Sequence, residues 1–217
     1  MIASDTDYVI MRLPDVIGPR DTTYKWWIYQ LWMQLSPVMT DHPIHIPGFL
    51  ETLDLSLVFS EDVARAVTQV LLDEQVRDKV QRQAFNLAFE EPVTMLQVFD
   101  EMKRFLRRDD VSINIINEES HLNHFYAYPS TRSGPVNVSK AMEVLSWKPT
   151  DFSSAIRQTV EFFEQAMTSS EFAGQRDEIV QVVGETLFRN NLMKFYENLE
   201  KVYSIDLKHF KYPKDEL

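Results

Sequence analysis

The sequence contains no cysteine, which excludes disulfides, thiolate nucleophiles and cysteine-based metal sites. Only 5 of its 217 residues are glycine, and they lie too far apart to form a glycine-rich loop that cradles a phosphate. No apolar run reaches the length of about 18 residues that a membrane-spanning helix needs. The net charge of −11 opposes binding to the phosphate backbone of a nucleic acid. The composition, 44% hydrophobic and 25% charged, is that of an ordinary globular protein, and the chain is long enough to bury a sizeable core.

The two ends of the chain carry different signals. Residues 1–7 are neither basic nor followed by a long apolar run, so they do not form a signal peptide. Residues 214–217 spell K-D-E-L, a C-terminal address that a receptor reads to retain proteins in the endoplasmic reticulum (Lys214, Asp215, Glu216 and Leu217). We therefore expect a location in the lumen of that compartment, with the retention receptor as a partner. An address without an entry signal leads us to expect that the natural protein continues upstream.

Residues 8–20, YVIMRLPDVIGPR, are the stretch on which the functional interpretation centres. Residues 8–11 are apolar and partly β-branched, which predicts a buried strand. Pro14 and the Gly18-Pro19 pair then predict a turning loop. Because ligands in an open α/β sheet bind beyond the carboxyl ends of parallel strands, we expect chemistry in residues 13–20. The alternative is a core strand followed by an ordinary loop.

Motifs along the chain, in this order, resemble one family. Residues 12–20, RLPDVIGPR, are similar to the strand and loop that follow the catalytic helix in the extended short-chain dehydrogenases/reductases, the NAD-dependent epimerase/dehydratase family. Residues 58–66, VFSEDVARA, resemble the family's V-x-x-x-D-V-A-x-A helix entry, and residues 85–88, FNLA, resemble its Y-N-L-G strand. Residues 139–149, SKAMEVLSWKP, resemble its S-K-A-x-x-x-L-G-W-x-P segment. The resemblance extends over residues 8–165.

The resemblance implies an α/β fold, the C-terminal part of a Rossmann-like doubly wound parallel sheet with a small mixed substrate-binding subdomain. Residues 1–167 would form the C-terminal half of an epimerase/dehydratase-like domain, and residues 168–217 a helical extension with a polar tail. The family's G-x-x-G-x-x-G fingerprint and its Tyr-x-x-x-Lys pair do not occur in this sequence. Both belong upstream of the matching strand, so no catalytic residue can be assigned and we expect the chain alone to be inactive.

The resemblance also nominates binding residues for a small molecule. Leu13 and Pro14 match positions that flank the nicotinamide of NAD or NADP. Asp15 matches a substrate-binding position that is often Asn, and its charge favours a hydroxyl or a cation over an anionic diphosphate. Leu55 replaces an Arg that binds the diphosphate in several nucleotide-sugar members, while Arg132, the only Arg of a polar loop, is the candidate ligand for a substrate phosphate. These residues suggest a possibly sugar-like substrate that differs from the usual nucleotide sugars, or a site that no longer catalyses.

Other polar residues have more than one interpretation. Asn137 begins the N-glycosylation sequon Asn137-Val138-Ser139, and it can instead cap the helix that follows. His42 and His45 are three residues apart in an extended segment and lack a third ligand, so we expect no metal site there.

Apolar periodicity predicts several helices. The expected helices cover residues 22–35 with Thr22 or Thr23 as cap, a segment capped by Ser60, residues 95–106 capped by Thr94, residues 153–167, and residues 179–203. The aromatic residues of the first helix are expected in the core, and the alternative is that they stack a base or a sugar ring.

Two hypotheses follow from the sequence. The first is the substrate-side half of an NAD(P)-dependent oxidoreductase of the endoplasmic reticulum. The second is a non-catalytic binding or scaffolding module with the same fold.

Overall fold

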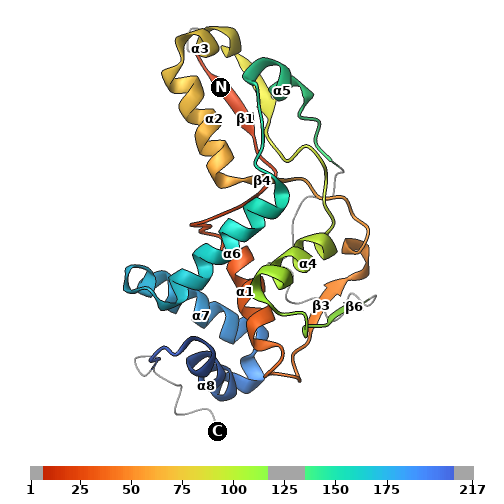
Figure 1. Cartoon of the computed structure of the whole chain (residues 1–217), viewed down its shortest axis with the longest axis vertical. Helices are drawn as coiled ribbons and strands as arrows, with labels where there is room; N and C mark the ends of the chain where they lie inside the picture. Colours follow the sequence, from red (N-terminus) through yellow and green to blue (C-terminus); the bar gives the residue numbers. More distant parts are fainter. Residues whose placement is uncertain (1–6, 117–134, 208–217) are drawn as a thin grey trace.

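Short parallel strand pairs and longer helices form two lobes in the computed structural model, which describes residues 7–116 and 135–207 (Figure 1). The sequence-predicted Arg132 and residues 214–217 lie outside the described residues. One lobe holds β1 (Val9–Arg12), α2 (Ser60–Leu72), α3 (Glu74–Val80), β5 (Gln83–Asn86) and α5 (Ser139–Leu145). The other holds α1 (Lys25–Leu35), β3 (Ile44–Pro47), α4 (Met95–Leu106), β6 (Ile113–Ile116), α6 (Phe152–Thr168), α7 (Ala173–Leu187) and α8 (Leu192–Tyr203). The strands β2 (Asp15–Ile17) and β4 (Leu57–Phe59) lie between the lobes.

All three strand pairs in the described part of the chain are parallel: β1 with β5, β2 with β4, and β3 with β6. Parallel pairing confirms the expected α/β class, and β5 overlaps residues 85–88, which resemble a strand of the family. The strand predicted at residues 8–11 forms as β1, but it is half-exposed and not buried as predicted. The expected loop after Pro14 is wrong at its start, because residues 15–17 form β2. Pro14 has no backbone N–H to donate, which explains why the ladder of β1 ends before β2 begins.

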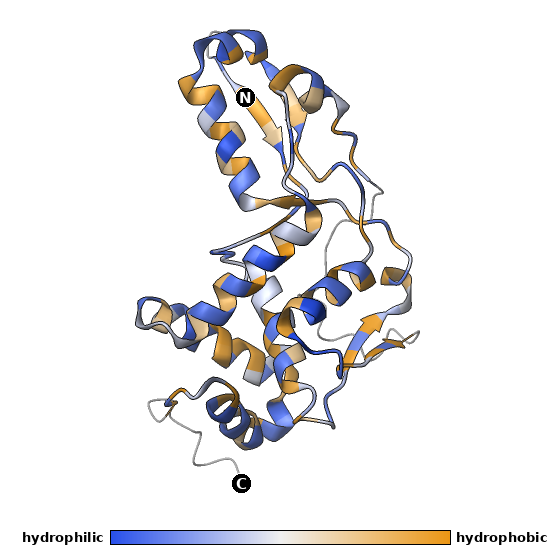
Figure 2. Cartoon of the chain, viewed as in Figure 1, coloured by the Kyte–Doolittle hydropathy of each residue, from blue (hydrophilic) through white to orange (hydrophobic). Residues whose placement is uncertain are grey.

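Two apolar cores divide along the same lines as the lobes. The smaller core joins β4, β5, α2 and α5 around Val58, Phe85 and Trp147. The larger core surrounds α1 and includes α4, α6, α7 and α8. Figure 2 shows hydrophobic residues along β1 and on α2, and some of these face solvent: Leu71 is 64% exposed and Leu72 78%.

Helix α1 confirms the predicted first helix and places its aromatic residues in the core. Nine of its residues are buried: Trp26, Trp27, Tyr29, Gln30, Leu31, Trp32, Met33, Gln34 and Leu35. The predicted caps are wrong. Thr23 donates its backbone N–H and its hydroxyl to Asp21 Oδ1, at 2.8 and 2.6 Å, and the helix begins after Tyr24, which has a φ of 57°.

Helix α2 contacts the loop after β2 at its first residue. Ser60 is that first residue and not the predicted cap, since the N-cap position is Phe59 and carries no side-chain cap. The Oγ of Ser60 would lie only 2.1 Å from a Cβ placed on Gly18, whose φ is 149°. Both the close approach and the positive φ therefore require glycine at position 18.

Asp62 has a structural role in the fold. It is fully buried, and its carboxylate accepts hydrogen bonds from the Thr150 backbone N–H and hydroxyl, both at 2.7 Å, and from Arg65 at 2.5 Å. These bonds tie α2 to the segment that leads into α6. The predicted Thr94 cap is also confirmed, as a capping box with Gln97.

The C-terminal segment is helical, as the apolar spacing over residues 179–203 predicts, and it is divided into two helices. Helices α7 and α8 are separated by a 3₁₀ turn, Arg189–Asn191, at which the apolar periodicity is interrupted by polar residues. Phe188 just before this turn stacks on Phe195 of α8 with ring centroids 5.0 Å apart. Helix α6, in contrast, matches its predicted range to within one residue at each end.

Tyr203 attaches the end of α8 to α6. Its hydroxyl donates to Glu164 Oε1 at 2.9 Å. Burial, followed by the Glu164 charge and this hydrogen bond, raises the pKa of Tyr203 well above its ordinary value of 10.0.

We predict that Tyr203 makes stability fall at alkaline pH. The unfolded state ionises Tyr203 near pH 10 while the folded state does not, so the stabilisation is complete below about pH 10 and is lost as the pH rises further. Chemical unfolding of the wild type above that pH should show about 1.4 kcal/mol more loss per pH unit than unfolding of Tyr203→Phe. Equal slopes for the two proteins would contradict the assignment.

Candidate functional site

The candidate site lies at the junction of β1 and β2, between the two lobes. Leu13 follows the last residue of β1 and is 42% exposed, whereas Pro14 is half-buried. On the neighbouring strand, Leu87 donates its N–H to the Arg12 carbonyl at 3.0 Å, which holds the end of β1 beside the end of β5. The two positions matched to nicotinamide contact therefore stand at the carboxyl ends of parallel strands, where ligands bind in open α/β sheets.

Asp15 forms an ion pair that sequence reasoning missed. Its Oδ1 lies 2.5 Å from Lys25 Nζ, and each side chain is only 13% exposed. Lys25 is the first residue of α1 and its only charged residue. A single cation at the start of an otherwise uncharged helix was a signal that could have pointed to a nearby carboxylate.

The backbone around Asp15 is held on both sides. Trp26 of α1 donates its indole N–H to the Val16 carbonyl at 2.7 Å. On the other side, β2 pairs with the fully buried strand β4, with Val16 opposite Val58. The site is thus built on fixed elements.

Leu55 is buried beneath this region and offers no polar group to a ligand. Its side chain is 1% exposed. Its backbone exchanges two hydrogen bonds with Val93, at 2.8 and 3.0 Å. The diphosphate-binding role of the matching Arg in several family members has no equivalent at this position.

Solved structures with the same arrangement of elements supply the family context. The chain resembles a UDP-glucose 4-epimerase of Thermotoga maritima, solved with UDP-glucose, with a TM-score of 0.58 and 22% identity over 76% of this chain. It also resembles a dTDP-glucose 4,6-dehydratase of Bacillus anthracis in complex with NAD, with a TM-score of 0.53 and 16% identity over 73% of this chain. The fold is that of the NAD-dependent epimerases and dehydratases.

The chain spans under half the length of those proteins, 48% of the epimerase and 45% of the dehydratase. A UDP-glucuronic acid 4-epimerase of Bacillus cereus, solved with UDP-glucuronic acid and NAD, is similar at a TM-score of 0.52 and 19% identity, with 45% of its length covered. No family model and no curated protein matches the sequence. The structural likeness therefore establishes the epimerase/dehydratase fold over part of that fold's length.

A dinucleotide fits this part of the epimerase/dehydratase fold only at one end. Exposed Leu13 and half-buried Pro14 offer an apolar surface suited to the flat nicotinamide ring. The glycine-rich loop that would accept the diphosphate is absent from the sequence. In the chain as it stands, Leu13 and Pro14 would contact the ring, whose chemistry when bound is hydride transfer.

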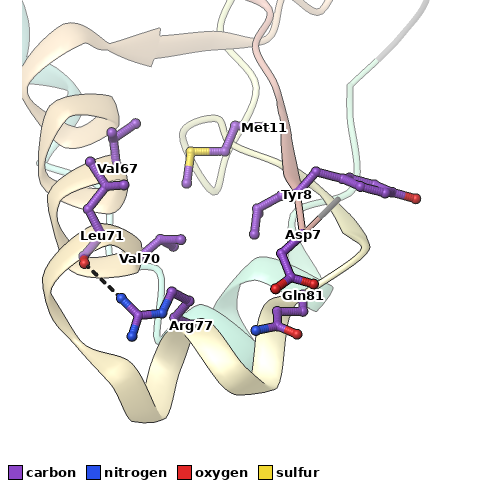
Figure 3. Close-up of a pocket in the computed structure, with 9 residues that line it drawn as sticks. Asp7, Tyr8, Met11, Val67, Val70, Leu71, Arg77 and Gln81 are labelled. Carbon is purple, nitrogen blue, oxygen red and sulfur yellow. Dashed lines mark hydrogen bonds between the residues drawn. The ribbon is translucent and has the colours of Figure 1, made fainter. Parts of the chain in front are cut away.

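A second feature of this fold fragment is an apolar pocket of about 410 Å³ between β1 and α2 (Figure 3). Val9, Met11, Val67, Val70 and Leu71 form its apolar lining, and Asp7, Tyr8, Arg77 and Gln81 complete it. Arg77 Nη1 donates to the Leu71 carbonyl at 3.3 Å, as Figure 3 shows. Within the described residues, β1 is paired along one edge only, with β5.

Two further residues that the sequence singled out are Asn137 and His42. Asn137 is exposed, and its Oδ1 accepts the Ser139 backbone N–H at 2.9 Å. The N-cap position of α5 is Val138 and not Asn137, and the glycosylation of Asn137 stays a prediction. His42 Nε2 lies 2.7 Å from Asn191 Nδ2. Over residues 7–116 and 135–207 no cluster of three His, Asp or Glu side chains is placed to hold a metal. None of the helices in those ranges is long and apolar enough to cross a membrane.

We predict that Lys25→Met destabilises the fold by about 2 kcal/mol, somewhat less than is typical of fully buried pairs because both side chains retain some exposure. The substitution leaves the Asp15 carboxylate without its cation. The double variant Asp15→Asn/Lys25→Met should recover most of the loss. Chemical denaturation measures all three proteins.

The matched control is Lys194→Met, which breaks an exposed pair with Asp41 at 3.8 Å. This change should cost no more than about 0.5 kcal/mol. Similar losses in the Lys25 and Lys194 variants would show that the Asp15 pair is not protected from solvent.

Proposed function

We propose that this chain is the substrate-side half of an NAD(P)-dependent epimerase/dehydratase-like oxidoreductase of the endoplasmic reticulum, and that it is inactive alone. The observation that carries the proposal is the epimerase/dehydratase fold with Leu13 exposed at the carboxyl end of β1. In that position Leu13 and Pro14 form one wall of a nicotinamide site. The opposite wall and the catalytic Tyr-x-x-x-Lys pair belong to a part of the fold that this sequence does not contain.

The face formed by β1 and α2 supports this incomplete site. An open strand edge beside an apolar pocket is a surface that proteins normally cover. Ile10 of β1 and Val67 of α2 are each 39% exposed here. The dinucleotide-binding part of the fold would extend the sheet from β1 and remove these side chains from water.

The substrate we propose is a small, sugar-like molecule that bears hydroxyl groups. The similar enzymes include proteins solved with UDP-glucose or UDP-glucuronic acid. Here Leu55 lacks a charge and Asp15 brings a carboxylate to the site, which disfavours a diphosphate. Arg132 remains the candidate for any contact with a substrate phosphate.

A specific observation favours the alternative of a non-catalytic binding or scaffolding module. The Asp15 carboxylate is engaged by Lys25 at 2.5 Å, so substrate contact by Asp15 competes with an ion pair. In a scaffolding module this pair would serve stability alone.

We predict that the full chain binds the nicotinamide ring weakly at Leu13 and forms no NADH with simple sugars or alcohols. NMR signals of the Leu13 methyl groups should shift with nicotinamide mononucleotide. NAD should bind no more than a few-fold tighter, because the chain has no phosphate cradle. Leu13→Asp should abolish the shifts.

The control is Leu72→Asp, a change at a leucine that is 78% exposed at the end of α2. It should leave the nicotinamide response intact. Tight NAD binding that Leu13→Asp does not weaken would refute the proposed site. Unmoved Leu13 signals would favour the scaffolding module.

We also propose that residues 214–217 retain the protein in the endoplasmic reticulum through the retention receptor. Placed behind an added secretion signal, the full chain should stay inside cells, and a variant that lacks these four residues should appear in the medium. Immunoblots of cells and medium measure the difference. A full chain that is secreted as fast as the shortened variant would rule out the address.

A further inference from the structure

A second cavity lies away from the proposed nicotinamide wall and is independent of it. It has a volume of about 210 Å³ and forms where the loop after β2 meets α1, α6 and the start of α7. Its lining consists of Arg20, Asp21, Thr22, Tyr24, Trp27, Phe162, Phe163, Phe172 and Gln175. None of the residues assigned to the nicotinamide or substrate positions lines it.

Aromatic rings that support one another form most of this wall. Trp27 stacks on Phe163 with ring centroids 4.9 Å apart and an angle of 20° between the planes. Phe162 contacts Phe172 edge to face at 5.1 Å, and Tyr24 contacts Trp27 edge to face at 6.4 Å. Such a surface is preorganised for a flat apolar ring.

Trp27 is only 2% exposed, and its indole N–H is buried without a hydrogen-bond partner. The other three tryptophans all donate theirs: Trp26 to Val16, Trp32 to His42 at 3.1 Å, and Trp147 to Ala88 at 2.9 Å. A buried donor without an acceptor costs free energy, and the great majority of buried polar groups avoid that cost. Among the four tryptophans, all of which the structure describes, Trp27 is thus the one whose indole N–H has no partner.

An unpartnered acceptor accompanies this donor. Asp21 Oδ1 accepts two bonds from Thr23, whereas Asp21 Oδ2 is buried with no partner. Two further polar groups of the wall, those of Arg20 and Tyr24, are already engaged. Arg20 pairs with Glu171 at 3.6 Å and lies over the Phe172 ring, and the Tyr24 hydroxyl donates to Glu178 at 2.6 Å. Two lining residues, Trp27 and Asp21, therefore hold a buried donor and a buried acceptor without partners on an aromatic background.

A hydroxyl group complements both kinds of atom. It accepts a hydrogen bond from an N–H and donates its own proton to a carboxylate, whereas an ammonium group cannot accept and an anion cannot donate. A monosaccharide would bring several further hydroxyls against apolar rings, where each unpaired one costs free energy. We propose that this cavity binds a small phenol-type compound, a hydroxylated aromatic ring, through Trp27 Nε1 and Asp21 Oδ2.

The test titrates the full chain with p-cresol, toluene and methyl glucoside by calorimetry or ligand-observed NMR. We expect saturable binding of p-cresol at one site, about tenfold tighter than toluene, which has the same shape without the hydroxyl. Trp27→Phe and Asp21→Asn should each reduce p-cresol affinity to the level of toluene. Absence of p-cresol binding, equal affinity for toluene, or tighter binding of methyl glucoside would overturn the proposal.

Trp32→Phe is the matched control in the same helix, because the Trp32 indole already has a partner. It should leave p-cresol affinity unchanged and lower the thermal stability of the ligand-free chain. Trp27→Phe loses a similar volume but no hydrogen bond, so it should lower the stability less. Equal destabilisation by the two changes, or p-cresol affinity unaffected by Trp27→Phe and Asp21→Asn, would show that the Trp27 N–H has a partner or that the ligand binds elsewhere.

Discussion

The burial of α1 on every side is the constraint on which the larger lobe depends. A helix that carries three tryptophans and a single charge has no face suited to water, so other elements must surround it. Helices α4, α6, α7 and α8 do so and share one core with it. Its two buried glutamines, Gln30 and Gln34, donate to Glu164 at 2.7 and 3.2 Å, the carboxylate that also accepts from Tyr203. Residues on both sides of position 167 therefore contribute to one core around α1.

The same helix fixes the candidate site, because its first turn holds β2. Lys25 and Trp26 both bond to residues of that strand, and Gly18 packs against Ser60 at the start of α2. The end of β1 is consequently set between two lobes whose positions are tied together, with Asp62 bonded to Thr150 as a further link. A binding wall at Leu13 needs such support, since recognition of a flat ring depends on surfaces that are held in place.

Periodicity and turn chemistry predicted the strand β1, although not its partial exposure, together with the core helix α1 and the Thr94 cap. Each of these follows from residues close together in the sequence. The short strand β2 depends on its pairing with β4, a partner elsewhere in the fold. The break at Arg189–Asn191 and the absence of caps at Thr23 and Ser60 are local departures that apolar periodicity did not predict. The Asp15 ion pair illustrates this dependence on tertiary structure. Asp15 and Lys25 come together only because the chain turns at Gly18 and α1 packs in its core.

The two cavities are bounded by different parts of the structure, and this difference indicates different roles. The pocket between β1 and α2 is open along a strand edge and lined by side chains such as Val9 and Met11 that belong in a continuous sheet. Under the proposed function, the rest of the fold would cover its apolar lining. The cavity at Trp27 is enclosed by four segments of this chain, and its unpartnered polar atoms lie among rings that are already packed. Completing the sheet would cover the first pocket, but it would supply neither a hydroxyl to Asp21 nor an acceptor to Trp27.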